Sequence, residues 1–574
     1  MSFVKGVDGR VKLLCLNLDY KLGKSYVIKA PTGSGKTTWV LLEVFKKVLE
    51  NGWKCFYTTS LRMGNEDVYR KAVKLYGVDK VGKVDGSVKD LEIRQREWSK
   101  PIVLTTFEEL LIYFRRLYMR NEKISKNIVV IIDEFHHVLD KLRVVVLLQI
   151  LAFCKMWNIP VILMSATFPE AENVARYVKG FYMSFGSNLT NKEIKLVKTS
   201  DKEIYAIVAR LVKDVLSKYR DINIVVFYES RNGLKRLHKL LNEYGLRSYV
   251  CYRGLEELPN IIEKFVKREV NILLTTSVIG EAINLPIDVG VIIVNDLVTS
   301  CKLVQMIGRV GRYGLTKLNK SLIYIVYTSR FEETVLKALR EDYGRINLCE
   351  LDDVVLTYLL QPLTLDKLVN LLRNTYGVSF DEYTFSQTIT KLLRLGLIEQ
   401  KIDSTYQTTK LGQLLVKYNI YVNEFLKFLN CFKKYNNIFD IVVCTLLHLG
   451  EVEPEYSIDR LTMCKEELKN FIKEEELNVE IQEVVGLREV RKTTRLPWLC
   501  VFNTCWLTYI DHFYRWIRFT QDYVLTSRKR LKILTITRKI LTLLDKFYKI
   551  RTCNEAKEIV HELVKTFLTK IQYT

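Results

Sequence analysis

Four residues near the N-terminus have the types and the spacing of a phosphate-binding loop. The segment SYVIKA runs directly into PTGSGKT, so Gly33, Gly35, Lys36 and Thr37 fall at the turn that opens a helix through Asn51. Glycines let backbone N–H groups surround phosphate oxygens, lysine supplies a point charge, and a threonine hydroxyl can ligate magnesium. The alternative is a glycine-rich turn without a ligand, since Ala30 stands where the strict pattern has glycine. We expect ATP and Mg²⁺ at Thr32, Gly33, Ser34, Gly35, Lys36, Thr37 and Thr38, with Lys36 in an exposed turn.

A pair of acids follows the apolar run NIVVII, as hydrolysis of a triphosphate requires. We expect Asp133 to hold the magnesium ion through water, and Glu134 to orient or deprotonate the attacking water. Acids are also favoured at a helix N-terminus, which is the structural alternative. His136 and His137 follow, but adjacent side chains point in different directions, so they do not predict a metal pair.

The segments that must position these residues alternate between short β-branched runs and amphipathic stretches, which predicts parallel sheets covered by helices. The first group of expected strands is Ser25–Ala30, Cys55–Thr59, Ile102–Thr105, Ile128–Ile132 and Pro160–Met164. After a polar stretch that starts at Gly186, the second group is Asn223–Tyr228, Asn271–Thr275, Gly290–Val294 and Leu322–Tyr327. The sequence therefore predicts two α/β domains in tandem.

Length and composition limit the class of protein. The 574 residues predict about three to five domains. The 88 basic residues against 65 acids give a net charge of +23, which favours a polyanionic partner, although a basic surface can also serve solubility. The 12 cysteines have no CxxC spacing, so we expect reduced thiols and no structural zinc. We find no signal peptide or membrane span and expect a cytoplasmic monomer.

The second half of the chain changes character at about residue 346. Short amphipathic helices followed by the polar stretch LIEQKIDSTYQTT predict a winged helix over 346–420, and residues 421–574 have a helical pattern. Residues 488–549 hold 14 Lys or Arg against 4 acids, which predicts a contact surface for nucleic acid. The two preceding domains would span 1–185 and 186–345.

Five motifs together resemble those of superfamily 2 DExH-box helicases, in particular the Ski-like branch that includes archaeal repair helicases. They are APTGSGKT, DEFH, the SAT triplet Ser165, Ala166 and Thr167, TTSVIGEAINLP, and QMIGRVGR. YQTTKLGQLLVKYNI also resembles the end of the winged helix in that branch. The resemblance implies two RecA-like domains, a winged helix and an all-helical C-terminal domain, with ATP and Mg²⁺ bound between the RecA-like domains.

The resemblance also implies roles for individual residues. Arg309 and Arg312 would be arginine fingers, Gln305 would sense the nucleotide and contact His136, the SAT triplet would couple the domains, and Asn284 would meet the ribose. Nucleic acid would be contacted by Thr59, Ser60, Arg62, Thr105, Thr106, Tyr228, Ser230, Arg231 and Thr276, although hydroxyls at strand ends also cap helices. A ratchet helix would add Arg515 and Arg518, with Trp516 or Tyr523 available for base stacking.

The sequence departs from the family pattern at three places. No glutamine precedes Lys36, Ala282 replaces a glycine, and only 18 residues separate Pro286 from Gln305, where duplex-splitting members carry a longer hairpin. We expect an ATP-driven motor that moves along single-stranded DNA, rather than RNA, from 3′ to 5′ and unwinds long duplexes weakly. The alternatives are an RNA helicase, an ATP-driven remodelling clamp without processive unwinding, and a P-loop small-molecule kinase, against which the arginine motif argues.

Overall fold

A computed structural model describes most of the first three quarters of the chain. The described residues are 3–5, 11–13, 20–59, 62–85, 91–122, 124, 127–140, 143–189, 192–251, 258–276, 285–311, 317, 318, 320–348 and 351–434. The chain divides into two compact units, within which residues contact one another more than they contact the other unit. One unit comprises residues 1–88 and 92–407, and the other comprises residues 89–91 and 408–574. Within the described residues, no helix is both long enough and apolar enough to cross a membrane.

The first domain is built on a seven-stranded parallel sheet with the strand order β5-β6-β4-β7-β8-β3-β9. Its strands are β3 (Tyr26–Lys29), β4 (Lys54–Thr59), β5 (Val81–Val84), β6 (Ile102–Thr106), β7 (Ile128–Ile132), β8 (Val161–Ser165) and β9 (Phe181–Ser184). Its helices are α1 (Lys36–Trp39), η1 (Val40–Val44), α2 (Phe45–Glu50), α3 (Arg62–Tyr76), α4 (Leu91–Ser99), α5 (Phe107–Met119), η2 (Phe135–Leu139), α6 (Arg143–Met156) and α7 (Ala171–Tyr177). A separate two-stranded sheet pairs β1 (Phe3–Lys5) with β2 (Val11–Leu13).

The order of this sheet brings the expected chemical residues to one edge. Strands β7, β8 and β3 are neighbours, and all of them run in the same direction, so their carboxyl ends meet. Two backbone hydrogen bonds continue the ladder past the strand ends, from Ala30 N to Ser165 O (3.1 Å) and from Asp133 N to Thr58 O (2.9 Å). The phosphate loop, the acid pair and the SAT triplet therefore start side by side.

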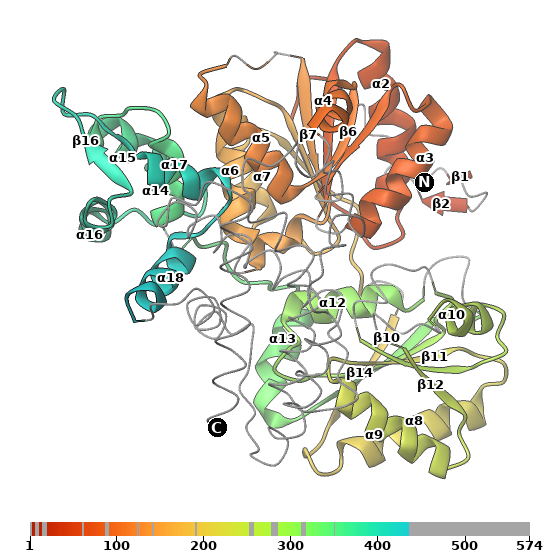
Figure 1. Cartoon of the computed structure of the whole chain (residues 1–574). Coiled ribbons are helices and arrows are strands. Elements are labelled where there is room, and N and C mark those ends of the chain that lie inside the picture. The colour runs from red at the N-terminus through yellow and green to blue at the C-terminus, as the bar shows by residue number, and fades with distance from the viewer. Residues whose placement is uncertain are drawn as a thin grey trace, which may run out of the picture. The chain divides into compact units, whose positions relative to one another are not determined.

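The second domain contains a six-stranded parallel sheet with the order β10-β15-β14-β11-β13-β12. Its strands are β10 (Lys192–Lys198), β11 (Ile224–Tyr228), β12 (Ser248–Cys251), β13 (Ile272–Thr275), β14 (Val289–Ile293) and β15 (Ser321–Tyr327). Its helices are α8 (Ile204–Lys218), α9 (Arg231–Glu243), α10 (Leu258–Val266), α12 (Ser300–Arg309), η3 (Ser329–Phe331) and α13 (Glu332–Leu339). Helices cover both faces of each sheet (Figure 1).

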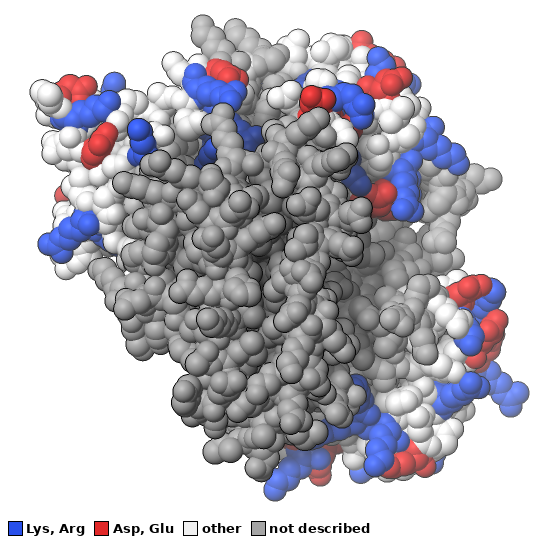
Figure 2. Space-filling view, in the orientation of Figure 1, with Lys and Arg blue, Asp and Glu red and all other residues white. Residues whose placement is uncertain are grey.

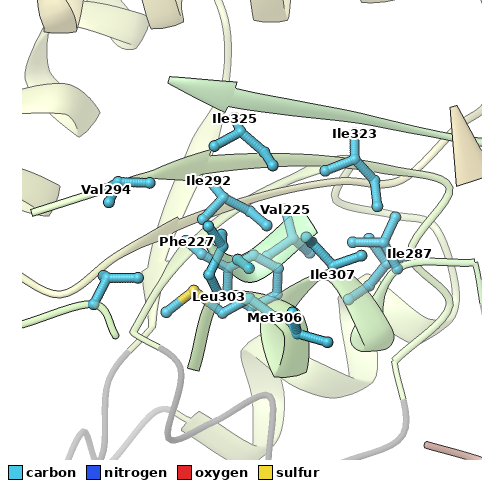
Figure 3. Close-up of a cluster of buried hydrophobic side chains, with 14 of the residues drawn as sticks. Val225, Phe227, Ile287, Ile292, Val294, Leu303, Met306, Ile307, Ile323 and Ile325 are labelled. Carbon is cyan, nitrogen blue, oxygen red and sulfur yellow. The ribbon is translucent and has the colours of Figure 1, made fainter. Parts of the chain in front are cut away.

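Alternate residues of the central strand β11 enter different cores. Val225 and Phe227 pack with residues of α10, α12 and α13, as Figure 3 shows in part, whereas Ile224 and Val226 pack with α8 and α9. Successive side chains of a strand point to opposite faces, so a strand covered by helices on both sides must be apolar throughout. This requirement explains the continuous run IVVF and places α12, which carries Arg309, against one defined face of the sheet.

The nine strands predicted from the sequence are all present, with ends that differ by at most one residue. Four strands that were not predicted complete the two sheets. Three of them, β5, β9 and β12, have only four residues each, and β10 mixes charged with apolar residues and begins at the end of the polar stretch that starts at Gly186. Each lies at the edge of its sheet, where strands need less apolar sequence.

Three helices and a small sheet follow the second domain. They are α14 (Asp352–Tyr358), α15 (Leu365–Arg373), α16 (Glu382–Arg394), β16 (Ile398–Gln400) and β17 (Tyr406–Thr408). Strands β16 and β17 pair, and an isolated antiparallel bridge joins Leu363 to Tyr406. This element order is the one expected for the winged helix. The second unit contributes α17 (Lys410–Lys417) and α18 (Val422–Lys434), and the rest of the expected helical domain lies outside the described residues.

Candidate functional site

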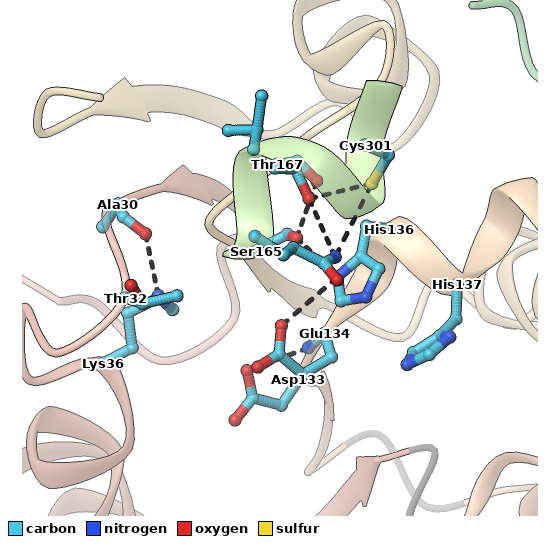
Figure 4. Close-up of polar contacts among 12 residues, drawn as sticks. Ala30, Thr32, Lys36, Asp133, Glu134, His136, His137, Ser165, Thr167 and Cys301 are labelled. Carbon is cyan, nitrogen blue, oxygen red and sulfur yellow. Dashed lines mark hydrogen bonds and ion pairs between the residues drawn. The ribbon is translucent and has the colours of Figure 1, made fainter. Parts of the chain in front are cut away.

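The phosphate loop has the backbone geometry that its sequence predicts. Gly33 (φ 78°) and Gly35 (φ 95°) both adopt the left-handed conformation that glycine tolerates best, and α1 begins directly afterwards at Lys36. The Lys36 ammonium group donates to the carbonyl oxygens of Ala30 (2.7 Å) and Pro31 (3.0 Å), as Figure 4 shows in part. Its side chain is buried, so the expectation of an exposed lysine is wrong, because the loop folds back over the ammonium group.

The remaining residues of this loop fit a phosphate ligand. The Ser34 hydroxyl is buried and has no hydrogen-bond partner, which is an unsatisfied polar group at a helix N-terminus. Thr37 is half-buried and Thr38 is buried. Together with the two left-handed glycines, these observations match the donor set that a triphosphate would use. Asn284, expected at the ribose, lies outside the described residues.

Asp133 is held by a tyrosine that the sequence analysis did not identify. The Tyr57 hydroxyl donates to Asp133 Oδ2 (2.6 Å), and the Glu134 backbone N–H donates to Asp133 Oδ1 (2.9 Å). Burial raises the pKa of Asp133 to about 6, and the neighbouring Glu134 adds to this effect. Burial also raises the pKa of Tyr57 well above its ordinary value, so the hydroxyl remains a neutral donor. Each carboxylate oxygen of Asp133 thus has one fixed donor, so the orientation of this side chain is set by the fold.

The surroundings of Glu134 lower its pKa, whereas those of Asp133 raise the pKa of that carboxyl group. Glu134 adopts a left-handed conformation (φ 54°) directly after the strand, and its Oε2 lies 3.3 Å from His136 Nδ1. Burial favours the neutral carboxyl, but the hydrogen bond from His136 and the charges of Lys36 and Arg309 outweigh it and hold the pKa of Glu134 below its usual range. Glu134 is therefore an anion that can accept a hydrogen bond from water.

A buried chain of polar contacts joins the acid pair to the second domain (Figure 4). His136 Nδ1 lies 3.1 Å from Ser165 Oγ, and Ser165 Oγ donates to Thr167 O (2.7 Å). Thr167 Oγ1 in turn lies 3.1 Å from Cys301 Sγ and accepts a hydrogen bond from Gln305 Nε2 (3.2 Å). Ser165, Ala166 and Thr167 are all buried. The SAT triplet therefore contacts both the DExH motif and α12.

Gln305 makes a different contact from the one expected. Its amide nitrogen donates to Thr167 and also lies 3.6 Å from Cys301 Sγ, rather than reaching His136. Ser165 of the SAT triplet contacts His136 instead, and Thr167 of the triplet contacts Gln305. Arg309 ends α12 and contributes a positive charge at Glu134, whereas Arg312 lies outside the described residues.

Two further residues of the site were missed because no local motif marks them. Asn188 Oδ1 accepts a hydrogen bond from the backbone N–H of Thr32 (2.9 Å) and lies 3.3 Å from the Thr32 hydroxyl. The Thr32 hydroxyl also lies 2.6 Å from Gly308 O. Asn188 stands in the polar stretch that starts at Gly186, which contains no motif. Cys301 stands one turn before Gln305, so its only signal in the sequence was its position beside the arginine motif.

The residues expected to contact nucleic acid fall into three groups. Thr106 and Ser230 cap α5 and α9 through hydrogen bonds from Glu109 N and Gly233 N, which is the structural alternative considered above. The side chains of Thr59 and Thr105 are buried in this structure. Tyr228 and Thr276 are half-buried, Arg231 is exposed, and Arg62 begins α3. Ser60, Arg515 and Arg518 lie outside the described residues.

The described surface carries both signs of charge. On the face that Figure 2 shows, lysine and arginine stand beside aspartate and glutamate. Ion pairs between described residues include Lys71–Asp67, Lys267–Glu263 and Lys337–Glu333. In the part of the chain that the structure describes, no group of three or more His, Cys, Asp or Glu residues could hold a metal ion. Cys55, Cys154, Cys251 and Cys301 are buried free thiols.

Comparison with known proteins identifies the two domains. Residues 16–175 match the DEAD/DEAH box helicase family, and residues 206–314 match the helicase conserved C-terminal domain. The ATP-dependent helicase Lhr-Core of Sulfolobus acidocaldarius is 24% identical over 424 residues, which are 63% of this chain and 47% of that protein. The ATP-dependent DNA helicase Hel308 of Aeropyrum pernix is 28% identical over 171 residues, which are 29% of this chain and 22% of that protein.

A solved structure has the same fold. The helicase Lhr of Mycobacterium smegmatis bound to ssDNA and AMP-PNP matches with a TM-score of 0.50 and 19% identity, over 69% of this chain and 57% of that one. The chain spans about half the length of curated relatives that it matches over several hundred residues. The two matched helicase domains and these relatives support a superfamily 2 helicase that is related to the archaeal repair helicases.

Proposed function

We propose that this protein hydrolyses ATP with Mg²⁺ and uses the energy to move along single-stranded nucleic acid. The observation that carries the proposal is the polar chain from Glu134 and His136 through the SAT triplet to Gln305, because it links a hydrolytic acid to a helix of the other domain. A phosphate site that is coupled in this way can convert the state of its nucleotide into movement of the domains.

Each residue of the site has a distinct task in this proposal. Lys36 and the N-terminus of α1 bind the phosphates, while Thr37 and Asp133 hold the magnesium ion. Bound Mg²⁺ would neutralise charge on the β and γ phosphates. Glu134 accepts a proton from, or orients, the attacking water, and Arg309 and Arg312 stabilise negative charge that develops on the γ-phosphate. Asn284 is proposed to contact the ribose.

We further propose that the substrate is DNA, followed with 3′ to 5′ polarity. The region 346–420 lacks the large insertion typical of exosome-associated RNA members, and the structural neighbour from M. smegmatis was solved with ssDNA. Tyr228, Arg231 and Thr276 remain at or near the surface of the second domain and are the proposed contacts there. The proposed domains span 1–185, 186–345, 346–420 and 421–574.

The direct test is ATP hydrolysis in the presence of matched oligonucleotides. We expect single-stranded DNA to stimulate turnover more than single-stranded RNA or blunt duplexes of the same length and sequence. Lys36→Ala should abolish turnover, because it removes the phosphate-binding charge, and it should also lower stability slightly because it leaves two carbonyl groups without their donor. Lys36→Ala with wild-type turnover would refute the site, and equal stimulation by DNA and RNA would refute the DNA preference.

A second candidate is an ATP-driven clamp that displaces bound proteins without processive unwinding. The favouring observation is the short connection between β14 and α12, which comprises residues 294–299 and contains no strand. A motor without a hairpin at this place lacks one means of splitting a duplex. Removal of streptavidin from a biotinylated 5′ end, which a protein moving from 3′ to 5′ would reach, without opening of an adjacent duplex, would favour the clamp.

The basic C-terminal segment is proposed to bind the single strand through Arg515 and Arg518. Replacing both with alanine should weaken binding of a single-stranded oligonucleotide and make the dependence of affinity on salt shallower, because fewer counterions are released. ATP hydrolysis without nucleic acid should not change. Titrations at several salt concentrations measure the slope, and an unchanged slope would place these arginines away from the strand.

A further inference from the structure

Asn188 lies where three separate segments of the chain meet. It stands between the end of β9 at Ser184 and the start of β10 at Lys192, in the connection between the two sheets. Its side chain is 2% exposed, although asparagine is usually found at the surface. A buried amide must have hydrogen-bond partners on both its oxygen and its nitrogen to avoid a large desolvation penalty. The partners of Asn188 therefore show what it does.

The amide oxygen faces the phosphate loop. It accepts a hydrogen bond from Thr32 N at 2.9 Å and lies 3.3 Å from Thr32 Oγ1. Thr32 directly follows Ala30 and Pro31, whose carbonyl groups hold the Lys36 ammonium group. Asn188 thus fixes the start of the loop that presents Lys36.

The other side of Asn188 faces the end of α12. Its amide nitrogen makes a long hydrogen bond of 3.5 Å to Val304 O. A Cβ atom added to Gly308 would lie 2.6 Å from Asn188 Cγ, so the glycine of the arginine motif is required for this close approach. The hydroxyl of Thr32 donates a hydrogen bond of 2.6 Å to Gly308 O, so Asn188, Thr32 and Gly308 all contact one another. Gly308 immediately precedes Arg309, whose charge acts on Glu134.

We propose that Asn188 is a positioning residue, which sets the phosphate loop and Arg309 in register with each other. This inference rests on the proposed function, and it adds a residue from outside the helicase motifs. Asn188 accepts a hydrogen bond from the backbone N–H of Thr32, so it acts through the loop and not on the nucleotide. One rigid, planar amide with partners on both sides restrains both segments together, and a small error in the position of an arginine finger has a large effect on rate.

The connection itself does not depend on Asn188 for its attachment. The neighbouring Ser187 hydroxyl donates to Glu341 Oε1 (2.5 Å), and Lys29 Nζ donates to Glu341 Oε2 (2.6 Å). These contacts tie the same segment to β3 and to the end of α13. Replacing Asn188 should therefore change the alignment of the site more than the fold.

The experiment compares three variants by turnover and by binding of a fluorescent ATP analogue. Asn188→Ala removes all the amide contacts, and Asn188→Asp keeps the acceptor for Thr32 but replaces the donor to Val304 with an oxygen. The control is Asn223→Ala, which removes a buried asparagine that bonds only elements of the second domain, through Phe265 O (2.9 Å). We expect about a tenfold loss of turnover for both Asn188 variants, and analogue affinity within about twofold of wild type. Asn223→Ala should lower the melting temperature without changing turnover of the folded protein.

The outcomes separate this inference from the proposed function. If wild type hydrolyses ATP and Lys36→Ala does not, but Asn188→Ala matches wild type, the positioning role is refuted while the function stands. Wild-type turnover in Asn188→Asp alone would show that the residue serves only the phosphate loop, which contradicts the proposal. In a double-mutant cycle with Thr32→Val, which keeps the backbone N–H bond to Asn188 but removes the hydroxyl that lies between Asn188 and Gly308 O, the two losses should be less than additive. Additive losses would overturn the inference.

Discussion

Asp133 and Glu134 are adjacent in the sequence, but their surroundings shift the pKa values of the two carboxyl groups in opposite directions. The pKa of Asp133 is raised by burial and by its neighbour, whereas that of Glu134 is lowered by His136, Lys36 and Arg309 against the effect of burial. The charge of Lys36 acts on both carboxyl groups, since Lys36 also opposes the rise in the pKa of Asp133. A magnesium ion beside Asp133 would further favour its charged form.

Replacing Glu134 tests the division of labour within this pair. Glu134→Gln should retain ATP binding and lose turnover by about 10²- to 10⁴-fold, because it removes the acceptor for the water proton and keeps the shape of the side chain. Asp133→Asn should instead lose binding that depends on Mg²⁺. Equilibrium binding of an ATP analogue with and without Mg²⁺, together with steady-state turnover, measures both effects. Equal loss of binding in both variants would mean that Glu134 has a structural role.

Arg309 offers the matching test on the other side of the site. Arg309→Ala and Arg312→Ala should each lower turnover far more than nucleotide affinity, by about 10³-fold or more, because their contacts strengthen as charge develops on the γ-phosphate. Arg330→Ala is the control, since that arginine is exposed and pairs with Asp296 on the surface. Single-turnover hydrolysis gives the rate, and two arginine variants with wild-type rates would remove the arginine-finger assignment.

At the scale of elements, polar contacts between partly buried side chains link the two RecA-like domains. Lys29 at the end of β3 pairs with Glu341, which follows α13, and Ser187 bonds the same carboxylate. Burial raises the pKa of Glu341, but the hydrogen bonds from Lys29 and Ser187 outweigh it and hold that pKa below the ordinary 4.5. The charged form of Glu341 therefore contributes to stability at neutral pH.

The sign of this pKa shift predicts how stability depends on pH. Because the folded-state pKa is depressed, the contribution is present above pH 4.5 and is lost as the pH falls through the folded-state value. Glu341→Gln should lower the free energy of unfolding by about 1–2 kcal/mol at pH 7, and the difference from wild type should shrink below pH 4.5. Denaturant unfolding at a series of pH values measures it. A difference that stays constant at acidic pH would contradict the ion pair.

At the scale of the whole molecule, the connection between β14 and α12 limits what the motor can do. One buried strand and the six residues 294–299 occupy the space between Pro286 and α12, so this part of the chain has no room for a long two-stranded pin. Splitting a base-pair step requires about 1.4 kcal/mol on average. Without such a pin, either other surfaces of the protein separate the base pairs or the duplex is not opened.

We expect strong stimulation of ATP hydrolysis by single strands, movement from a 3′ overhang, and weak unwinding of long duplexes. Strand-displacement assays on duplexes of increasing length, each with a 3′ or a 5′ overhang, measure this directly. The matched control is a blunt duplex of the same sequence. Processive opening of a long blunt duplex would prove the expectation wrong, and movement from the 5′ overhang alone would reverse the proposed polarity.

The sequence by itself determined the local chemistry and the two-domain α/β architecture. A phosphate loop, an acid pair and nine strands are local patterns, because glycine conformation, strand periodicity and helix starts depend on neighbouring residues. For the same reason the left-handed Gly33 and Gly35 and the strand before Asp133 could be predicted one segment at a time.

Only the tertiary structure decided which side chains meet. Tyr57 reaches Asp133 across 76 residues, Asn188 reaches Thr32 across 156, and Gln305 reaches Thr167 across 138. Such contacts depend on strand order and on the burial of each group, which no short window of sequence contains. For this reason the predicted exposure of Lys36 was wrong, and Gln305 contacts Thr167 rather than the predicted His136. Buried polar groups must find donors and acceptors, and the fold alone sets which ones are within reach.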